Sequence, residues 1–323
     1  MNKYSLILPL LLALGIGANG FATIQSAAAT IAQQQEQQAP TTVTIAIQPT
    51  AQAADIQAQG QQLEQFLEER TGYDIQIYVP LSYAGVIEAL RFGQADVAFM
   101  SAWPSYLAVN RANASLELAE VREVIINDTL TDATYYFSYW VTRPDSPANN
   151  LEDLREMRAA FPNPLSTSGY VMPMYTLVNQ SLIQVEEGQE VDPETFFSEV
   201  LFAGGYAQAW EALRNGAVDV SIIAGDVDEE LYFEVLNNTK VIHEQGPIPS
   251  HGVVFNNDID PSIKENLKAA LLEIGNDDSS RQIMRDLVSA IFVGFQETTA
   301  EEHLSSLNRA LNATGLAFTE EIS

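Results

Sequence analysis

A fifteen-residue segment that occurs twice constrains the fold of this chain more than any other feature. Residues 83–97 read YAGVIEALRFGQADV and residues 206–220 read YAQAWEALRNGAVDV, so nine of fifteen positions are identical at a constant offset of 123 residues. That offset is far longer than the roughly 20–50 residues of a solenoid unit. The repeat therefore predicts two lobes, each with one copy of the same unit.

Each copy has the pattern of a strand, a helix and a second strand. Apolar residues recur at three- and four-residue spacing in the middle of the segment, which is typical of a helix packed on a sheet. Gly93 and Gly216 lie just beyond the helix ends, where glycine adopts the left-handed conformation. Strands are expected at 74–81, 96–100, 198–204 and 219–225. This unit builds a parallel sheet covered by helices.

The remaining pattern completes two α/β lobes, each with a parallel or mixed sheet. Further strands are expected at 42–49, within 132–147 and twice within 239–257, and helices at 56–69, 151–158, 170–182, 228–236, 262–274, 279–292 and 299–313. Two β-rich segments, 134–142 and 249–256, bracket the second repeat copy, so we expect the chain to cross twice between the lobes. Lobe 1 is predicted to comprise 42–138 with 252–323, and lobe 2 to comprise 139–251.

The N-terminus is typical of an exported protein. Residues 1–32 combine Lys3, an apolar run from Tyr4 to Ile16 and small residues near Ala29, which is the layout of a signal peptide. The apolar run is shorter than the roughly 20 residues of a membrane span, although an uncleaved anchor is the alternative. Residues 33–41 are expected to be a disordered leader. We expect the rest to be periplasmic after cleavage.

Composition excludes several classes of function. The chain has no cysteine, which excludes thiol nucleophiles, disulfides and thiolate metal sites. Its net charge of −28 repels nucleic acid and anionic membranes. No metal site, cofactor or nucleic-acid partner is predicted, and we expect a monomer.

Three consecutive hydroxyl residues form the most informative motif. Ser166, Thr167 and Ser168 precede Gly169 in PLSTSGYVMP, at the start of an expected helix. They can cap that helix, supply a nucleophile, or hold an anion at the helix N-terminus. Capping and anion binding are compatible. The nucleophile alternative is weak, because the segment lacks the G-x-S-x-G sequence in which hydrolases place their catalytic serine.

These motifs together resemble the phosphonate, phosphite and phosphate-binding periplasmic proteins of ABC transporters. The matching segments are 82–99, 134–147, 164–173 and 202–229. The resemblance extends from about residue 43 to 315. It implies the periplasmic-binding-protein fold of type II, with two crossover hinge strands and a ligand in the cleft between the lobes, and it implies a binding protein without catalytic residues.

The resemblance also implies a set of ligand-binding residues. They are Tyr83, Tyr136, Ser166, Thr167, Ser168, Tyr206, Asp226 and His251. Two of them depart from the family pattern, because Tyr206 stands where a histidine is usual and His251 where an acid that holds a ligand amine is usual. The second departure favours a ligand without an amine.

The roles of the charged members follow from simple electrostatics. No lysine or arginine lies in the matched turns, so we expect hydroxyls and dipoles alone to hold the anion. Asp226 would then repel the ligand unless the ligand carries a proton, which predicts discrimination against sulfate. Asp226 can alternatively cap the helix at 228–236. His251 is expected either to donate to the ligand, more effectively when protonated, or to lie in a solvated loop.

The roles of three further residues, Tyr136, Ser101 and Trp103, are not decided by the sequence. Tyr136 lies in an aromatic strand in which alternation groups it with Ser138 and Trp140. Ser101 and Trp103 are expected either to line the cleft or to pack in the core.

The sequence therefore predicts an exported binding protein that captures a small phosphorus oxyanion, such as phosphite, an alkylphosphonate or phosphate. Closure of the two lobes would trap this ligand, and a membrane permease of an ABC importer would receive it. The alternatives are a sensor for the same ligand class and, more remotely, a serine hydrolase that uses Ser166 or Ser168 with His251.

Overall fold

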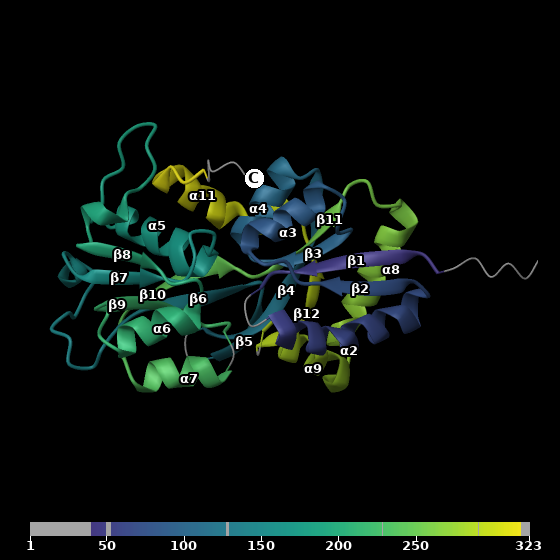
Figure 1. The fold of residues 1–323 in the computed structure, drawn as a ribbon, viewed down its shortest axis with the longest axis horizontal. Coiled ribbons are helices and arrows are strands. Elements are labelled where there is room, and N and C mark those ends of the chain that lie inside the picture. The colour runs from purple at the N-terminus through teal and green to yellow at the C-terminus, as the bar shows by residue number, and fades with distance from the viewer. Residues whose placement is uncertain (1–39, 50–52, 127–128, 228, 290, 318–323) are drawn as a thin grey trace, which may run out of the picture. The chain divides into compact units, whose positions relative to one another are not determined.

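The computed structural model describes residues 40–49, 53–126, 129–227, 229–289 and 291–317 (Figure 1). The predicted signal peptide and residues 33–39 of the predicted leader lie outside these described residues. Within the described ranges, no helix combines the length and the apolar character that a membrane span requires.

Seven strands form the first sheet, in the order β12–β4–β11–β3–β1–β2, with β5 paired to β4. β1 pairs in parallel with both β2 and β3, and the other pairs in this sheet are antiparallel. The strands are β1 Thr42–Ile47, β2 Asp74–Tyr78, β3 Val97–Met100, β4 Ala114–Ile126, β5 Thr129–Ala133, β11 Gly252–Asn256 and β12 Phe292–Glu297.

Five strands form the second sheet, in the order β10–β6–β9–β7–β8. β7 pairs in parallel with β8 and β9, whereas β6 runs antiparallel to β9 and β10. The strands are β6 Tyr135–Thr142, β7 Arg158–Phe161, β8 Glu199–Phe202, β9 Val220–Ala224 and β10 Lys240–Pro249. Both sheets are mixed, as the sequence predicts.

Helices cover both faces of each sheet, as parallel strands require. On the first sheet, α2, α8 and α9 share one core with β1 and β2, and α3 and α4 belong to another. On the second sheet, α5 packs on one face and α6 with α7 on the other. The helices are α2 Ala53–Thr71, α3 Tyr83–Arg91, α4 Ala102–Arg111, α5 Met172–Asn179, α6 Tyr206–Arg214, α7 Glu229–Asn237, α8 Pro261–Leu272, α9 Asp278–Leu287, α10 Ala300–His303 and α11 Ser305–Thr314. Single helical turns form η1 Glu152–Leu154, η2 Thr167–Val171, η3 Pro193–Thr195 and η4 Glu273–Gly275.

The two repeat copies fold alike. α3 and α6 each begin at the repeated tyrosine and end at the repeated arginine. Gly93 and Gly216 follow them with φ of 66° and 73°, and the amide of each glycine donates to the carbonyl three residues earlier. The predicted supersecondary unit and its glycine ends are confirmed.

We call the part built on the seven-stranded sheet lobe 1 and the part built on the five-stranded sheet lobe 2. The chain changes sheet between β5 and β6 and returns between β10 and β11. The C-terminal helix α11 follows lobe 1 in sequence but is linked to lobe 2, since the Val191 amide donates to the Thr314 carbonyl at 2.7 Å. The exact lobe limits given above stay a prediction.

Several local expectations differ from the structure. The helix expected at 151–158 is a single turn, and Arg158–Phe161 pairs as strand β7. The helix expected at 279–292 ends at Leu287, and Phe292–Glu297 forms β12. β4 was not expected at all. In each case, pairing with a strand distant in sequence overrides a weak local preference.

Gly93 provides a test of the repeat's helix ends. Because its φ of 66° suits glycine and a Cβ there would meet no atom within 4 Å, Gly93→Ala should cost only backbone strain, about 1–2 kcal/mol of unfolding free energy. Urea unfolding measures this loss. Gly93→Asn should lose less, because asparagine tolerates the left-handed region; equal stability of the alanine variant and the parent would contradict the argument.

Candidate ligand-binding site

Four hydroxyl groups predicted from the sequence meet in one network. The Tyr136 hydroxyl donates to Ser168 Oγ at 2.9 Å, and Ser168 Oγ lies 2.7 Å from the Tyr206 hydroxyl. The Tyr206 hydroxyl also lies 3.2 Å from Ser166 Oγ. These residues come from β6, η2 and α6, so three elements of lobe 2 converge on Ser168. Hydroxyls both donate and accept and rotate freely, so each can turn to an anionic ligand.

Local geometry explains why the serines face this network. Ser166 caps the helical turn η2, because its Oγ accepts from the Gly169 amide at 3.0 Å. A Cβ on Gly169 would lie 2.1 Å from Pro162 Cγ, so only glycine fits where η2 passes Pro162. Pro173 stands in the first turn of α5, where its missing amide costs nothing. The capping role is thus confirmed for Ser166.

Thr167 makes a contact between the lobes. Its Oγ1 accepts from the Trp103 amide at 2.8 Å, at the start of α4 in lobe 1. The Trp103 side chain is buried and its ring lies 5.5 Å from the tilted Tyr106 ring, and Ser101 donates to Gln48. Core packing is therefore the correct alternative for the Trp103 ring, and a ligand contact by Thr167 stays a prediction.

The two repeated tyrosines occupy equivalent places, as the first residues of α3 and α6. Tyr83 hydrogen-bonds Gln48, and burial raises its pKa to about 12. Burial and then the charge of Asp226 raise the pKa of Tyr206 as well. Both phenols are therefore neutral near pH 7 and can donate to an anion.

Asp226 pairs with an arginine that sequence reasoning missed. Arg122 Nη1 lies 2.6 Å from Asp226 Oδ2, and the Arg122 side chain is completely buried. Arg122 is a cation that the matched turns did not indicate, and it is shared by two carboxylates, Asp226 and Glu120. That hydroxyls and dipoles alone hold the anion, and that sulfate is rejected, stay predictions.

Arg122 holds a second carboxylate and an aromatic ring. Its Nε and Nη2 donate to Glu120 Oε2 at 3.1 and 2.7 Å, and its guanidinium carbon lies 4.5 Å from the centre of the Tyr136 ring. Burial, first of all, raises the pKa of Glu120. Because the Tyr136 hydroxyl bonds Ser168, only one ring separates this cation from the hydroxyl network.

His251 is part of the same buried cluster. Its Nε2 lies 3.6 Å from Asp226 Oδ2 and its Nδ1 lies 3.8 Å from Glu120 Oε1. Burial, followed by the charge of Arg122 and by His303, lowers its pKa well below the usual value. The solvated-loop alternative is wrong, because His251 is buried. The imidazole is neutral near pH 7 and keeps one N–H group, so donation to the ligand stays a prediction.

A pattern in β4 could have revealed this cluster. Alternate residues from Ala114 to Val124 are buried, and Glu120 and Arg122 fall on that apolar face. Opposite charges two residues apart on a buried strand face indicate a pair that is desolvated together.

The hydrolase alternative gains no support from these contacts. Ser168 bonds two tyrosines, whereas His251 lies beside two carboxylates. Among the described residues, no group of histidine and acidic side chains is arranged to hold a metal ion.

The family is established by comparison with known proteins. A family model described as "ABC transporter, phosphonate, periplasmic substrate-binding protein" matches residues 45–303. The chain belongs to this family. The resemblance of the sequence motifs is thereby confirmed.

Individual relatives agree with this assignment. The chain is 31% identical over 182 residues to the phosphate-import protein PhnD of Mycolicibacterium smegmatis, and 26% identical over 236 residues to the phosphonates-binding periplasmic protein of Escherichia coli. These matches cover 56% and 71% of this chain but only 54% and 64% of the relatives. A binding-protein component of an ABC phosphonate transporter from Pseudomonas aeruginosa shares the fold, with a TM-score of 0.68 and 22% identity over 88% of this chain and 92% of its own.

Removing Arg122 tests the buried cluster. Arg122→Met leaves the Glu120 and Asp226 carboxylates buried without a cation, and we expect a loss of about 3–5 kcal/mol in unfolding free energy. Arg214→Met is the control, because the ion pairs of Arg214 are exposed and such pairs contribute roughly 0–1 kcal/mol. Urea unfolding compares them, and equal losses would show that the cluster is unimportant for stability.

The neutral His251 predicts a pH dependence. Its pKa is lower in the folded state than in the unfolded chain, so its contribution to stability is complete above about pH 6.5 and is lost as the pH falls below that value. We expect the stability of the parent protein to fall between pH 7 and 5 by up to about 1.4 kcal/mol per pH unit more than that of His251→Gln.

Two features of this measurement isolate His251. The raised pKa of Glu120 acts in the opposite direction, so the difference between variants is the relevant quantity. His243→Gln is the matched control: burial lowers the pKa of this partly exposed histidine too, and we expect a smaller change in slope. An identical pH profile for His251→Gln and the parent would contradict the assignment.

Proposed function

We propose that this chain is exported to the periplasm, captures a small phosphorus oxyanion between its lobes and delivers it to the permease of an ABC importer. The observation that carries the proposal is the convergence of Ser166, Ser168, Tyr136 and Tyr206 in a single hydroxyl network. Such groups are neutral, adjustable donors, which suits an anion that must be bound and later released.

The names of the relatives support the ligand class but differ in the ligand. One is a phosphate-import protein and the other a phosphonates-binding protein. Phosphate and phosphonates share a tetrahedral phosphorus with at least three oxygens. A network of hydroxyls recognises these shared oxygens, so we propose the class and leave the fourth substituent open.

Charge at the site is compatible with an anion. Arg122 is shared by Asp226 and Glu120, burial raises the pKa of Glu120, and the lowered pKa of His251 keeps that side chain neutral. Tyr83 and Tyr206 stay protonated because burial raises their pKa values. The ligand therefore meets donors close by and one buried cation behind the Tyr136 ring, with hydrogen bonds to a charged group contributing about 1.5–3 kcal/mol each.

Closure of the lobes provides the mechanism that we propose. Two contacts join the lobes beside the hydroxyl network: Trp103 to Thr167, and Arg122 to Asp226. Tyr83 comes from lobe 1 and the hydroxyl network from lobe 2, so a ligand touched by both would favour the closed arrangement. The permease would then recognise the closed form.

Calorimetry with phosphite, methylphosphonate and phosphate tests the proposal. We expect at least one of them to bind saturably, and Ser168→Ala to weaken that binding about ten- to hundredfold, because one hydrogen bond to a charged group is lost. Combining Ser168→Ala with Thr167→Ala should abolish binding.

Ser280→Ala is the matched control, since Ser280 is a buried serine that donates to Ile274 in lobe 1, away from the network. Its affinity should equal that of the parent. Failure of all three oxyanions to bind the parent protein would overturn the proposed function, and unchanged affinity of Ser168→Ala would remove the network from the site.

A further inference from the structure

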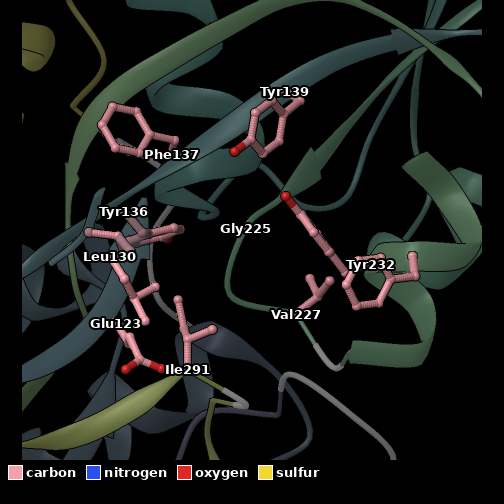
Figure 2. Close-up of a pocket in the computed structure, with 11 residues that line it drawn as sticks. Glu123, Leu130, Tyr136, Phe137, Tyr139, Gly225, Val227, Tyr232 and Ile291 are labelled. Carbon is pink, nitrogen blue, oxygen red and sulfur yellow. The ribbon is translucent and has the colours of Figure 1, made fainter. Parts of the chain in front are cut away.

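A cavity lies beside the crossover strand β6 and borders the hydroxyl network at Tyr136. It has a volume of about 330 Å³ and is lined from both lobes (Figure 2). Its walls are Glu123, Val124, Leu130 and Ile291 from lobe 1, and Tyr136, Phe137, Tyr139, Gly225, Val227, Tyr232 and Phe233 from lobe 2.

Strand alternation places two aromatic side chains of β6 at this cavity. The side chains of Tyr136 and Ser138 bond Ser168, and both are buried. Phe137 and Tyr139 point to the opposite face of β6, as successive strand residues do, and they line the cavity. Tyr136 lines the cavity as well, so the cavity and the hydroxyl network share this residue.

Aromatic rings dominate the part of the wall that lobe 2 provides. The Tyr139 and Tyr232 rings are 6.2 Å apart and tilted by 58°, and Tyr232 meets Phe233 edge-on at 5.5 Å. In Figure 2 the hydroxyls of Tyr139 and Tyr232 point toward one another. The faces of such rings are negative and attract cations, above all quaternary ammonium groups.

The charge at the cavity is negative and unbalanced. No lysine or arginine is among its lining residues, and the Glu123 carboxylate has no ion pair within the described part of the chain. Asp132 stands directly opposite Glu123 in the β4–β5 pair. Like charges placed opposite one another across strands destabilise a sheet, and a cation at the cavity relieves that repulsion. The net charge of −28 adds to the attraction.

The entrance is apolar and open to solvent. Leu130 in lobe 1 and Phe233 in lobe 2 line the cavity although they are 60% and 50% exposed. Exposed apolar groups that border an aromatic cavity favour a ligand with an apolar part. We propose that this cavity is a second binding site, for a small organic ammonium ion.

Titration with choline tests this site, with the uncharged analogue 3,3-dimethylbutan-1-ol of the same shape as the paired probe. Saturation-transfer NMR or calorimetry should show saturable binding of choline and roughly tenfold weaker binding of the alcohol, because cation–π attraction requires the charge. Glu123→Gln and Tyr232→Leu should each weaken choline binding, and Tyr232→Leu should do so without removing a charge.

Controls distinguish this site from the oxyanion site and from general charge effects. Glu301→Gln removes a carboxylate outside the cavity, and Phe92→Leu removes an exposed aromatic ring outside it; both should bind choline as the parent does. Ser168→Ala should do so too, because Ser168 is not among the residues that line the cavity. Equal binding of choline and the alcohol, no saturable choline binding, or unchanged binding in both cavity variants would overturn the proposal.

Discussion

The ion pair between Arg122 and Asp226 links the two lobes through a guanidinium that water does not reach. A buried cation is tolerated only when its charge and its donors are satisfied, and four elements share this task for Arg122. The Glu120 carboxylate accepts a hydrogen bond from the guanidinium, and the Tyr136 ring lies against the guanidinium face. His251 lies beside both carboxylates. The positions of β4, β6, the residue after β9 and the segment between β10 and β11 are therefore mutually dependent.

This dependence extends to the hydroxyl network. Tyr136 touches Arg122 with its ring and Ser168 with its hydroxyl, so a movement of the cation displaces the residue at the centre of the network. Burial is the first cause of the local pKa shifts, since it lowers the pKa of His251 and raises that of Glu120. Arg122 is shared by the Glu120 and Asp226 carboxylates, and the Tyr136 ring lies between this cluster and the hydroxyl network.

The sequence predicted the features that depend on local pattern. The strand–helix–strand unit, its glycine ends and the Ser166 cap all follow from residues within a few positions of one another. The proximity of Tyr136, Ser168 and Tyr206 also followed, but it relied on the family resemblance. β4 and its Arg122 were missed because their stability comes from partners elsewhere: Arg122 and Asp226 are 104 residues apart. A prediction from residue type alone places a charged residue at the surface. Only the alternation along β4 shows that Glu120 and Arg122 are buried.

Strand β6 connects the hydroxyl network that we propose as the oxyanion site with the cavity that we propose as an ammonium site. Two cavity residues are sequence neighbours of the buried ion pair. Gly225, whose amide donates to the Phe137 carbonyl, precedes Asp226, and Glu123 follows Arg122. Both lobes line the cavity, so its shape changes whenever the lobes move relative to each other. A ligand there shifts the closure equilibrium only by the difference in its affinity for the open and closed arrangements. By linkage, an oxyanion that closes the cleft must change ammonium affinity by the same factor by which the ammonium ion changes oxyanion affinity.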